Sequence, residues 1–311
     1  MKFQKQAKII LNNCLNINKK DRVLIITDKK RREIGEAIKK EAKNIAIVAD
    51  LVLIPIPKVS GTEPPEEVAK KMLNYTVILA PTTESITHTY SVKNAVKNGA
   101  RVATLPGINE KIMKQSMLAN YDKVEELTNK VFKKVNGCTN ISITTHSGTE
   151  LSFSVKGRKW FLDRGKIFKY SGNLPGGEVF IAPLEGTTNG VIVIDKFEHD
   201  GEEFAPPGTK IIIKGGNVID ISNKKCKIAK LFKEIKDGTN IAEFGIGTNY
   251  KAKLIGNILQ DEKCLKTCHI AFGSNFSMGG KIKTDMHIDT VLKNPTIKMD
   301  RKTIMKSGEL V

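Results

Sequence analysis

The sequence predicts an α/β domain with a doubly wound parallel sheet over residues 1–136, followed by an α+β, β-rich domain over residues 137–311. In the first part, short apolar runs alternate with helical patterns, which is typical of a parallel sheet covered by helices. In the second part, short strand-like segments are separated by turns rich in glycine, asparagine and serine. A chain of 311 residues is long enough to give each domain its own core.

The first domain is expected to hold four strands. The acids and prolines of Glu63–Glu67 predict a helix start, because the first turn of a helix tolerates both. No Gly-x-Gly-x-x-Gly follows any of the strands, so a dinucleotide site is not expected. In order, the expected elements are a helix at 3–16, a strand at 22–27, a helix at about 31–46, a strand at 49–56, a helix from 63–67, a strand at 76–80, a helix near 90–98, a strand at 101–105, and helices at 109–117 and 120–135.

The second domain is expected to consist mainly of strands, with two helices near 224–237 and 250–266. Residues 286–305 read as three strands separated by turns at Asn294-Pro295 and Asp300-Arg301. The other expected strands are 140–145, 149–155, 178–182, 190–195, 210–214 and 217–221.

Composition and charge exclude several classes of protein. The net charge is +18, but only seven of the 51 basic residues are arginine, and no basic stretch is interleaved with aromatics, so no nucleic-acid partner is expected. No apolar run has the length of a membrane span and residues 1–5 do not begin a signal peptide, so no membrane partner and a cytoplasmic location are expected. The five scattered cysteines indicate reduced thiols.

His287 and Asp289 are the most informative pair in the chain. Residues two apart on a strand point to the same face, so an imidazole and a carboxylate would enter one pocket side by side. This is a common start to a divalent metal site. A lone His-x-Asp also fits a surface pair at a strand end, and the neighbouring sequence has to decide between the two.

Three further side chains are candidates for the same site. Glu178 follows a Pro-Gly-Gly turn at a strand start, where it could approach a metal or remain solvated at a hairpin rim. Glu243 has mostly apolar neighbours, and carboxylates are seldom buried unless they are paired or coordinate a metal. His269 fits either a ligand or a core histidine. Its neighbours Cys264 and Cys268 lack the second pair that a zinc cluster needs.

Other types of chemistry have weaker support. His88 follows the third strand, near where open α/β sheets bind ligands, and fits either a substrate contact or a hydrogen bond at a helix start. His146 and His199 lie in turn-like segments and are read as incidental. There is no Gly-x-Ser-x-Gly elbow and no phosphate-binding loop. Metal chemistry is therefore the best-supported option.

Taken together, these motifs resemble the aminopeptidase T family of thermophilic metallo-aminopeptidases, in a short-chain branch. The resemblance rests on the segments Asn173–Pro183, Glu243–Gly247, Cys268–Gly273 and His287–Asp289. It implies a homodimer that acts on small peptides with two divalent ions, zinc, cobalt or manganese. The implied metal ligands are Glu178, Glu243, His269, His287 and Asp289.

The implied reaction is hydrolysis by a metal-activated water, with Glu178 or Glu243 moving its proton. The free amino group of the substrate would bind one metal, which gives N-terminal selectivity. The family has a catalytic tyrosine where this chain has Phe276, a candidate substrate contact, so an oxyanion-stabilising phenol would have to come from Tyr250 or another group. The interval between His269 and His287 is also shorter than in the family.

A different class of enzyme remains open. His269, His287 and Asp289 are also a two-histidine, one-carboxylate set of the kind that binds a single Fe(II). Dihydroxypyridine ring-cleaving dioxygenases look similar to the same fold family and use such a triad on a small-molecule substrate. The presence of both glutamates favours the two-metal hydrolase. A metal-free binding protein on the same scaffold is the third alternative.

Overall fold

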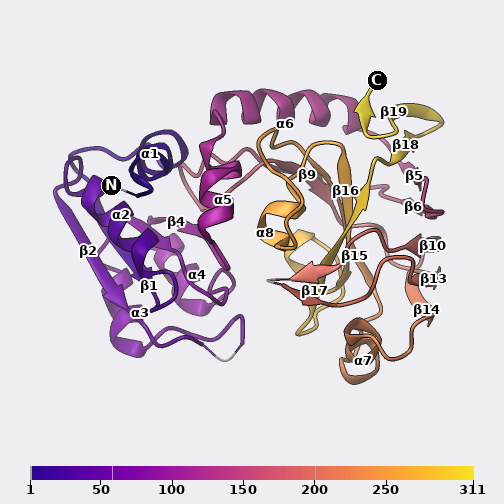
Figure 1. The fold of residues 1–311 in the computed structure, drawn as a ribbon, viewed down its shortest axis with the longest axis horizontal. Helices are drawn as coiled ribbons and strands as arrows, with labels where there is room; N and C mark the ends of the chain where they lie inside the picture. Colours follow the sequence, from indigo (N-terminus) through magenta and orange to yellow (C-terminus); the bar gives the residue numbers. More distant parts are fainter. Residues whose placement is uncertain (1, 58, 200) are drawn as a thin grey trace. The chain divides into compact units, whose positions relative to one another are not determined.

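The computed structural model describes residues 2–57, 59–199 and 201–311 (Figure 1). The chain forms two compact units. Unit 1 comprises residues 1–125, 163–176 and 251–253, and unit 2 comprises 126–162, 177–250 and 254–311. Both units are discontinuous in sequence, whereas the sequence suggested a single boundary after residue 136. In the described part of the chain, no helix is long and apolar enough to cross a membrane.

Sheet A of unit 1 is a parallel sheet with the strand order β2-β1-β3-β4-β8. The order reverses direction between β1 and β3, which is the mark of a doubly wound sheet, so the predicted fold class is confirmed. Its fifth strand was not predicted. The strands are β1 (Arg22–Thr27), β2 (Val48–Leu53), β3 (Val77–Ala80), β4 (Arg101–Thr104) and β8 (Ser171–Asn173).

Helices connect the strands of sheet A. Helix α2 packs against β1 and β2, and α4 packs against β4. Helix α4 begins where the Thr89 side chain accepts a hydrogen bond from the Val92 amide, which satisfies a free donor at the helix start. The helical segments are α1 (Gln4–Lys8), the π-helix η1 (Ile9–Cys14), α2 (Arg32–Ala42), α3 (Glu66–Met72), α4 (Tyr90–Lys97), α5 (Glu110–Lys114), the 3-10 helix η2 (Ser116–Leu118) and α6 (Tyr121–Val135).

Unit 2 is rich in strands, as predicted. Sheet B has the order β14-β13-β10-β6-β5-β18-β19-β20, and sheet C has the order β17-β16-β15-β9-β7. The strands of sheet B are β5 (Asn140–Thr144), β6 (Glu150–Ser154), β10 (Asn189–Val193), β13 (Lys210–Lys214), β14 (Asn217–Ile221), β18 (Thr296–Met299), β19 (Lys302–Lys306) and β20 (Glu309–Leu310). Sheet C contains β7 (Phe161–Asp163), β9 (Glu178–Ile181), β15 (Ile241–Gly247), β16 (Thr267–Gly273) and β17 (His287–Lys293).

Shorter elements complete unit 2. They are the hairpin of β11 (Glu198–His199) and β12 (Glu202–Glu203), helices α7 (Lys227–Glu234) and α8 (Ile258–Asp261), and the 3-10 helix η3 (Phe276–Met278).

The structure corrects the expected helix at 250–266. Only α8 is helical there, and the segment before it is turn and loop. Gly256 has a φ of 78°, in the left-handed region that interrupts a helix. The amides of Ile255 and Gly256 donate instead to the Asp261 carboxylate, at 2.8 and 2.9 Å. A local side-chain turn therefore replaces the first turns of the expected helix.

Strands β15 and β16 were also missing from the prediction. Every residue of both strands is buried, because both faces of these central strands are covered. Such a strand lacks the alternation of apolar and polar residues that identifies a half-exposed one. On one face, Phe244 and Ile246 of β15 and Ile270 and Phe272 of β16 pack into the core of unit 2. The other face of these two strands carries the buried polar side chains of Glu243 and His269.

Candidate metal centre

The predicted ligands share one face of sheet C. Side chains alternate along a strand, so residues next to the core positions point to the opposite face. Val179 of β9, Phe244 of β15, Ile270 of β16 and Ile288 of β17 belong to or pack against the core. Their sequence neighbours on the other face are Glu178, Glu243, His269, His287 and Asp289.

Small residues make room for these side chains. Across the strand pairs, Glu178 lies opposite Gly247, His269 opposite Gly245, and His287 opposite Gly273. Ala271 lies opposite both Glu243 and Asp289, on its two sides. A Cβ atom on Gly245 would lie 2.1 Å from His269 Nε2, so the position of the ring requires glycine there.

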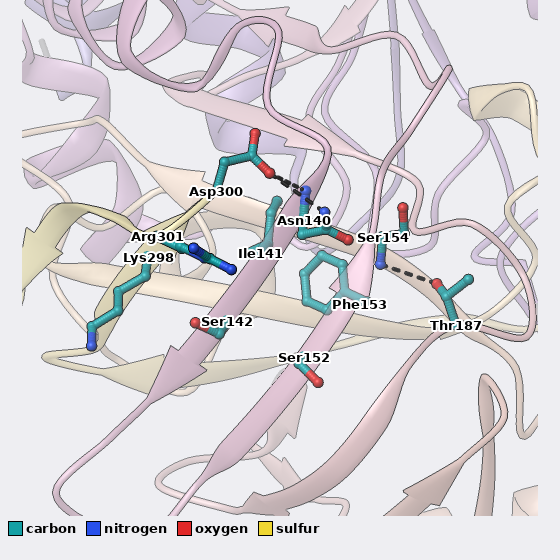
Figure 2. A pocket seen from close by; sticks show the side chains of 10 residues that line it. All are labelled: Asn140, Ile141, Ser142, Ser152, Phe153, Ser154, Thr187, Lys298, Asp300 and Arg301. Carbon is teal, nitrogen blue, oxygen red and sulfur yellow. Dashed lines mark hydrogen bonds between the residues drawn. The ribbon is translucent and has the colours of Figure 1, made fainter.

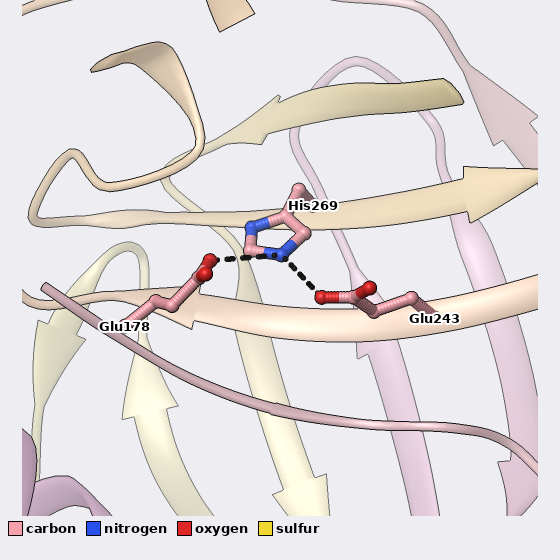
Figure 3. Close-up of side chains that lie close together, drawn as sticks. All are labelled: Glu178, Glu243 and His269. Carbon is pink, nitrogen blue, oxygen red and sulfur yellow. Dashed lines mark hydrogen bonds and ion pairs between the residues drawn. The ribbon is translucent and has the colours of Figure 1, made fainter. Parts of the chain in front are cut away.

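Glu178, Glu243 and His269 form what we call the inner group, in which all three side chains are buried. His269 Nε2 lies 3.4 Å from Glu178 Oε2 and 3.4 Å from Glu243 Oε1. Figure 3 shows the imidazole between the two carboxylates, which come from β9 and β15. One nitrogen thus faces two carboxylate oxygens, and a cation bound there would contact all three groups.

Glu243, His287 and Asp289 form the outer group, which shares Glu243 with the inner group. His287 Nε2 lies 3.1 Å from Glu243 Oε2 and 3.9 Å from Asp289 Oδ2. The His287 ring donates from Nδ1 to the Ser274 carbonyl at 2.8 Å, which leaves Nε2 as the nitrogen for a ligand. The two oxygens of Glu243 therefore serve different histidines, and this residue can bridge two ions.

The electrostatics of the cluster is set by burial and by mutual contacts. Burial raises the pKa of Glu178 to about 8, and the charge of Lys263 offsets only part of this effect. Burial likewise raises the pKa of Asp289 to about 6. Burial alone would lower the pKa of both histidines, but contacts with Glu243 outweigh it and raise the pKa of His269 to about 9 and of His287 to about 10.

Glu243 behaves in the opposite way. Burial would raise its pKa, but hydrogen bonds from His269 and His287 and their charges hold it well below its usual range. Two imidazoles that keep their protons around one ionised carboxylate form a site where positive charge is stabilised. A divalent cation supplies that charge when the protons leave.

The residues fit a divalent metal. Glu178 Oε2 and His269 Nδ1 are buried without a hydrogen-bond partner among the described residues, and orphaned buried oxygens are rare because they cost stability. Glu178 Oε2 is one of the two oxygens aimed at His269 Nε2. Carboxylate oxygens and imidazole nitrogens are suitable donors for zinc, cobalt, manganese and Fe(II).

The alternative cysteine cluster is not supported. Cys268 lies on the core face of β16, opposite to His269, and burial raises the pKa of its thiol well above its ordinary value. Cys264 Sγ donates to the Gln260 carbonyl at 3.7 Å.

The two candidate substrate contacts, His88 and Phe276, lie in different units. His88 belongs to unit 1, in the turn that precedes α4, and Thr89 rather than His88 caps that helix. Phe276 begins η3 in unit 2 and is 58% exposed, with Lys283 Nζ 5.8 Å from its ring centre. Both assignments remain predictions.

The sequence analysis did not assign a role to three residues beside the cluster, Lys263, Glu262 and His199. Lys263 Nζ donates to Glu178 Oε1 at 2.7 Å and pairs with Glu262. His199, read as incidental, has Nε2 3.2 Å from the Asp289 carbonyl oxygen and packs against Phe204. The segment Asp261-Glu262-Lys263 has the charged composition of an exposed segment, so the local sequence gave no indication that Lys263 is buried.

A pocket elsewhere in unit 2 is separate from the cluster. It has a volume of about 650 Å³ and lies over β5, β6 and β18 of sheet B (Figure 2). Half of its lining residues are serine, threonine or asparagine, and Lys298 and Arg301 lie at one side. It contains none of the predicted ligands.

Comparisons with known proteins come from sequence and from structure. The sequence model of the family described as thermophilic metalloprotease (M29) matches residues 61–296. No curated protein sequence matches the chain.

Two solved structures share the fold. A 2,5-dihydroxypyridine dioxygenase from Pseudomonas putida KT2440 aligns with a TM-score of 0.80 and 15% identity, over 99% of this chain and 96% of that one. Wild-type AmpT from Thermus thermophilus aligns with a TM-score of 0.76 and 14% identity, over 100% of this chain and 99% of that one.

Proposed function

The chain belongs to the thermophilic metalloprotease (M29) family, and we propose that it is a metal-dependent aminopeptidase that removes N-terminal residues from small peptides. The observation that carries the proposal is the position of Glu243. Its two oxygens face His269 in the inner group and His287 in the outer group. A carboxylate shared in this way supports a pair of divalent ions, zinc, cobalt or manganese, held by Glu178, Glu243, His269, His287 and Asp289.

When bound, the metal pair supplies a Lewis acid and a water of lowered pKa. Glu178 would hold a metal through Oε2, the oxygen that faces His269, because Oε1 is bonded to Lys263. The proton of that water would pass to the leaving amine through Glu178 or Glu243, whichever lies nearer the water. His287 is held in the tautomer that presents Nε2 by its bond to Ser274.

The site lacks a phenol at position 276 to stabilise the oxyanion of the tetrahedral intermediate. Phe276 has no hydroxyl and is mostly exposed, so it cannot donate a hydrogen bond to the tetrahedral intermediate. We therefore expect a lower turnover number than a site with a phenol at this position would give.

A single-iron dioxygenase is the second candidate, because one solved structure with a similar fold is a dioxygenase. That similarity, at 15% identity, concerns the fold. The arrangement of donors favours the hydrolase. His269 lies with two glutamates in the inner group, whereas His287 and Asp289 lie in the outer group, so the iron triad is divided between two groups.

Metal analysis after anaerobic purification, without chelators or affinity metals, tests the proposal together with a peptide cleavage assay. We expect about two zinc, cobalt or manganese ions per chain and release of N-terminal residues. Glu178→Gln should abolish cleavage, while Glu150→Gln, at an exposed position of β6, should leave it unchanged. One Fe(II) lost in air, with no peptide cleavage, would overturn the hydrolase.

A further inference from the structure

Lys263 places a buried ammonium beside the inner group. It follows α8, and only 2% of its side chain is exposed. Its Nζ donates to Glu178 Oε1 at 2.7 Å and to Glu262, whose side chain is 13% exposed. Burying an ammonium is costly unless it is paired and hydrogen-bonded, and these two carboxylates meet that need.

This pairing divides the Glu178 carboxylate. Oxygen Oε1 is bonded to Lys263, while Oε2 faces His269 Nε2 at 3.4 Å and has no hydrogen-bond partner among the described residues. Only Oε2 is open to a metal ion. The Glu178 carboxylate therefore separates the positive charge of Lys263 from the place where a cation would bind in the inner group.

The outer group is not arranged in this way. In the described structure, its side chains contact one another and the Ser274 carbonyl, the Asp289 backbone carbonyl contacts His199, and no ion pair joins the group to a lysine. Like charges repel more strongly in a buried site than in water. The repulsion from Lys263 thus acts mainly on the inner group.

We propose that Lys263 makes the two metal positions unequal, so that the outer group binds a divalent ion tightly and the inner group binds a second ion weakly. The inference rests on the metal centre of the proposed function and concerns the order in which it fills. The ammonium of Lys263 already bonds Oε1 of Glu178 before any metal arrives. The shared carboxylate of Glu243 is already used by the first ion when the second one binds.

The test is a titration of the metal-free protein with Co²⁺ or Zn²⁺, followed by calorimetry and by metal content after dialysis. Wild-type protein should bind one ion at least about tenfold more tightly than the second. Lys263→Met and Lys263→Gln should tighten the second ion by about tenfold or more and leave the first unchanged. Glu178→Gln should remove the weak ion only. Two ions of equal affinity in the wild type would overturn the inference.

A purely structural role for Lys263 predicts the reverse, because a damaged site binds both ions less well. Weaker or unchanged binding of the second ion in both Lys263 variants would therefore also overturn the inference. If neither variant folds, two ions of equal affinity in the wild type would still overturn the inference.

Lys166→Met is the matched control. Lys166 in unit 1 also pairs with two carboxylates, Asp122 at 2.7 Å and Glu125 at 2.6 Å. Its replacement removes the same charge from a similar pair and should change neither metal affinity.

The outcome is separable from that of the proposed function. Unequal binding of two ions, with the second ion tightened in the Lys263 variants but no peptide cleavage, would support the role of Lys263 and overturn the aminopeptidase. Peptide cleavage by a protein that binds two ions with equal affinity would support the aminopeptidase and overturn the role of Lys263.

Discussion

Asp21 in unit 1 and Glu178 in unit 2 are both buried carboxylates paired with a largely buried cation, yet their pKa values move in opposite directions. Both oxygens of Asp21 accept hydrogen bonds, Oδ1 from Arg101 and Thr76 and Oδ2 from the Asn18 amide. Burial alone would raise its pKa, but these donors outweigh burial and lower it. The ionised form of Asp21 is thus stabilised by the fold.

Glu178 has a donor on one oxygen only. Lys263 bonds Oε1, Oε2 has no hydrogen-bond partner among the described residues, and burial raises the pKa to about 8. The fold of the metal-free protein therefore disfavours the ionised form that a metal needs. A buried carboxylate with hydrogen bonds on both oxygens, such as Asp21, stabilises the fold. A buried carboxylate with one unbonded oxygen, such as Glu178, costs stability and leaves that oxygen for a ligand.

The largest effect is expected at the residue that both groups share. Glu243→Gln removes the bridging charge, and we expect peptide cleavage to fall by roughly a thousandfold, about 4 kcal/mol of transition-state stabilisation. The measurements are kcat/KM for a peptide and metal content per chain. If Glu243→Gln kept two ions and near-wild-type activity, the cluster would be a structural ion network like that of Asp21.

The next effect is on stability. Asp21→Asn leaves the largely buried Arg101 without its counter-charge, and we expect a loss of roughly 2–4 kcal/mol in the free energy of unfolding. Urea unfolding of the metal-free chain measures it. Metal content should stay at the wild-type value, and a loss of bound metal in Asp21→Asn would break the comparison.

The same change of carboxylate to amide in Glu178→Gln should leave the free energy of unfolding nearly unchanged. At pH 4.5 the Glu178 carboxyl of the folded protein is uncharged, and the amide oxygen of the new side chain can still accept from Lys263, so we expect the free energy of unfolding of the metal-free protein to change by less than about 1 kcal/mol at that pH. Urea unfolding without metal gives the value. A loss as large as that of Asp21→Asn would show that Glu178 serves stability after all.

The pH dependence of stability sharpens the comparison between Asp21 and Glu178. A lowered pKa means that the contribution of Asp21 is present above the unfolded value of 3.8 and is lost as the pH falls through the folded value. A raised pKa means that the contribution of Glu178 is present below 4.5 and is lost as the pH rises through about 8. Between pH 4.5 and 8, metal-free wild-type protein should therefore lose stability relative to Glu178→Gln. Parallel stability curves for the two proteins would contradict this.

Local patterns predicted much of the fold and the chemistry of the site. Strands β1, β3 and β4 lie where apolar runs placed them, and the two-residue period correctly put His287 and Asp289 on one face of a strand. The helix at 250–266 was wrong, because the turn at Asp261 is a contact that helical periodicity does not reveal. Strands β15 and β16 were missed because burial on both faces erases alternation.

By itself the sequence determined the doubly wound sheet, the β-rich second domain and the identity of the five candidate ligands. These depend on the order of short segments and on residue types, which are local properties. Only the tertiary structure decided that Glu243 is shared by two groups and that Lys263 is buried against Glu178, 85 residues away in sequence. Strand pairing brings these side chains together, and burial then sets their charges. The register between distant strands and the local dielectric depend on the whole fold, so no single segment of the chain predicts them.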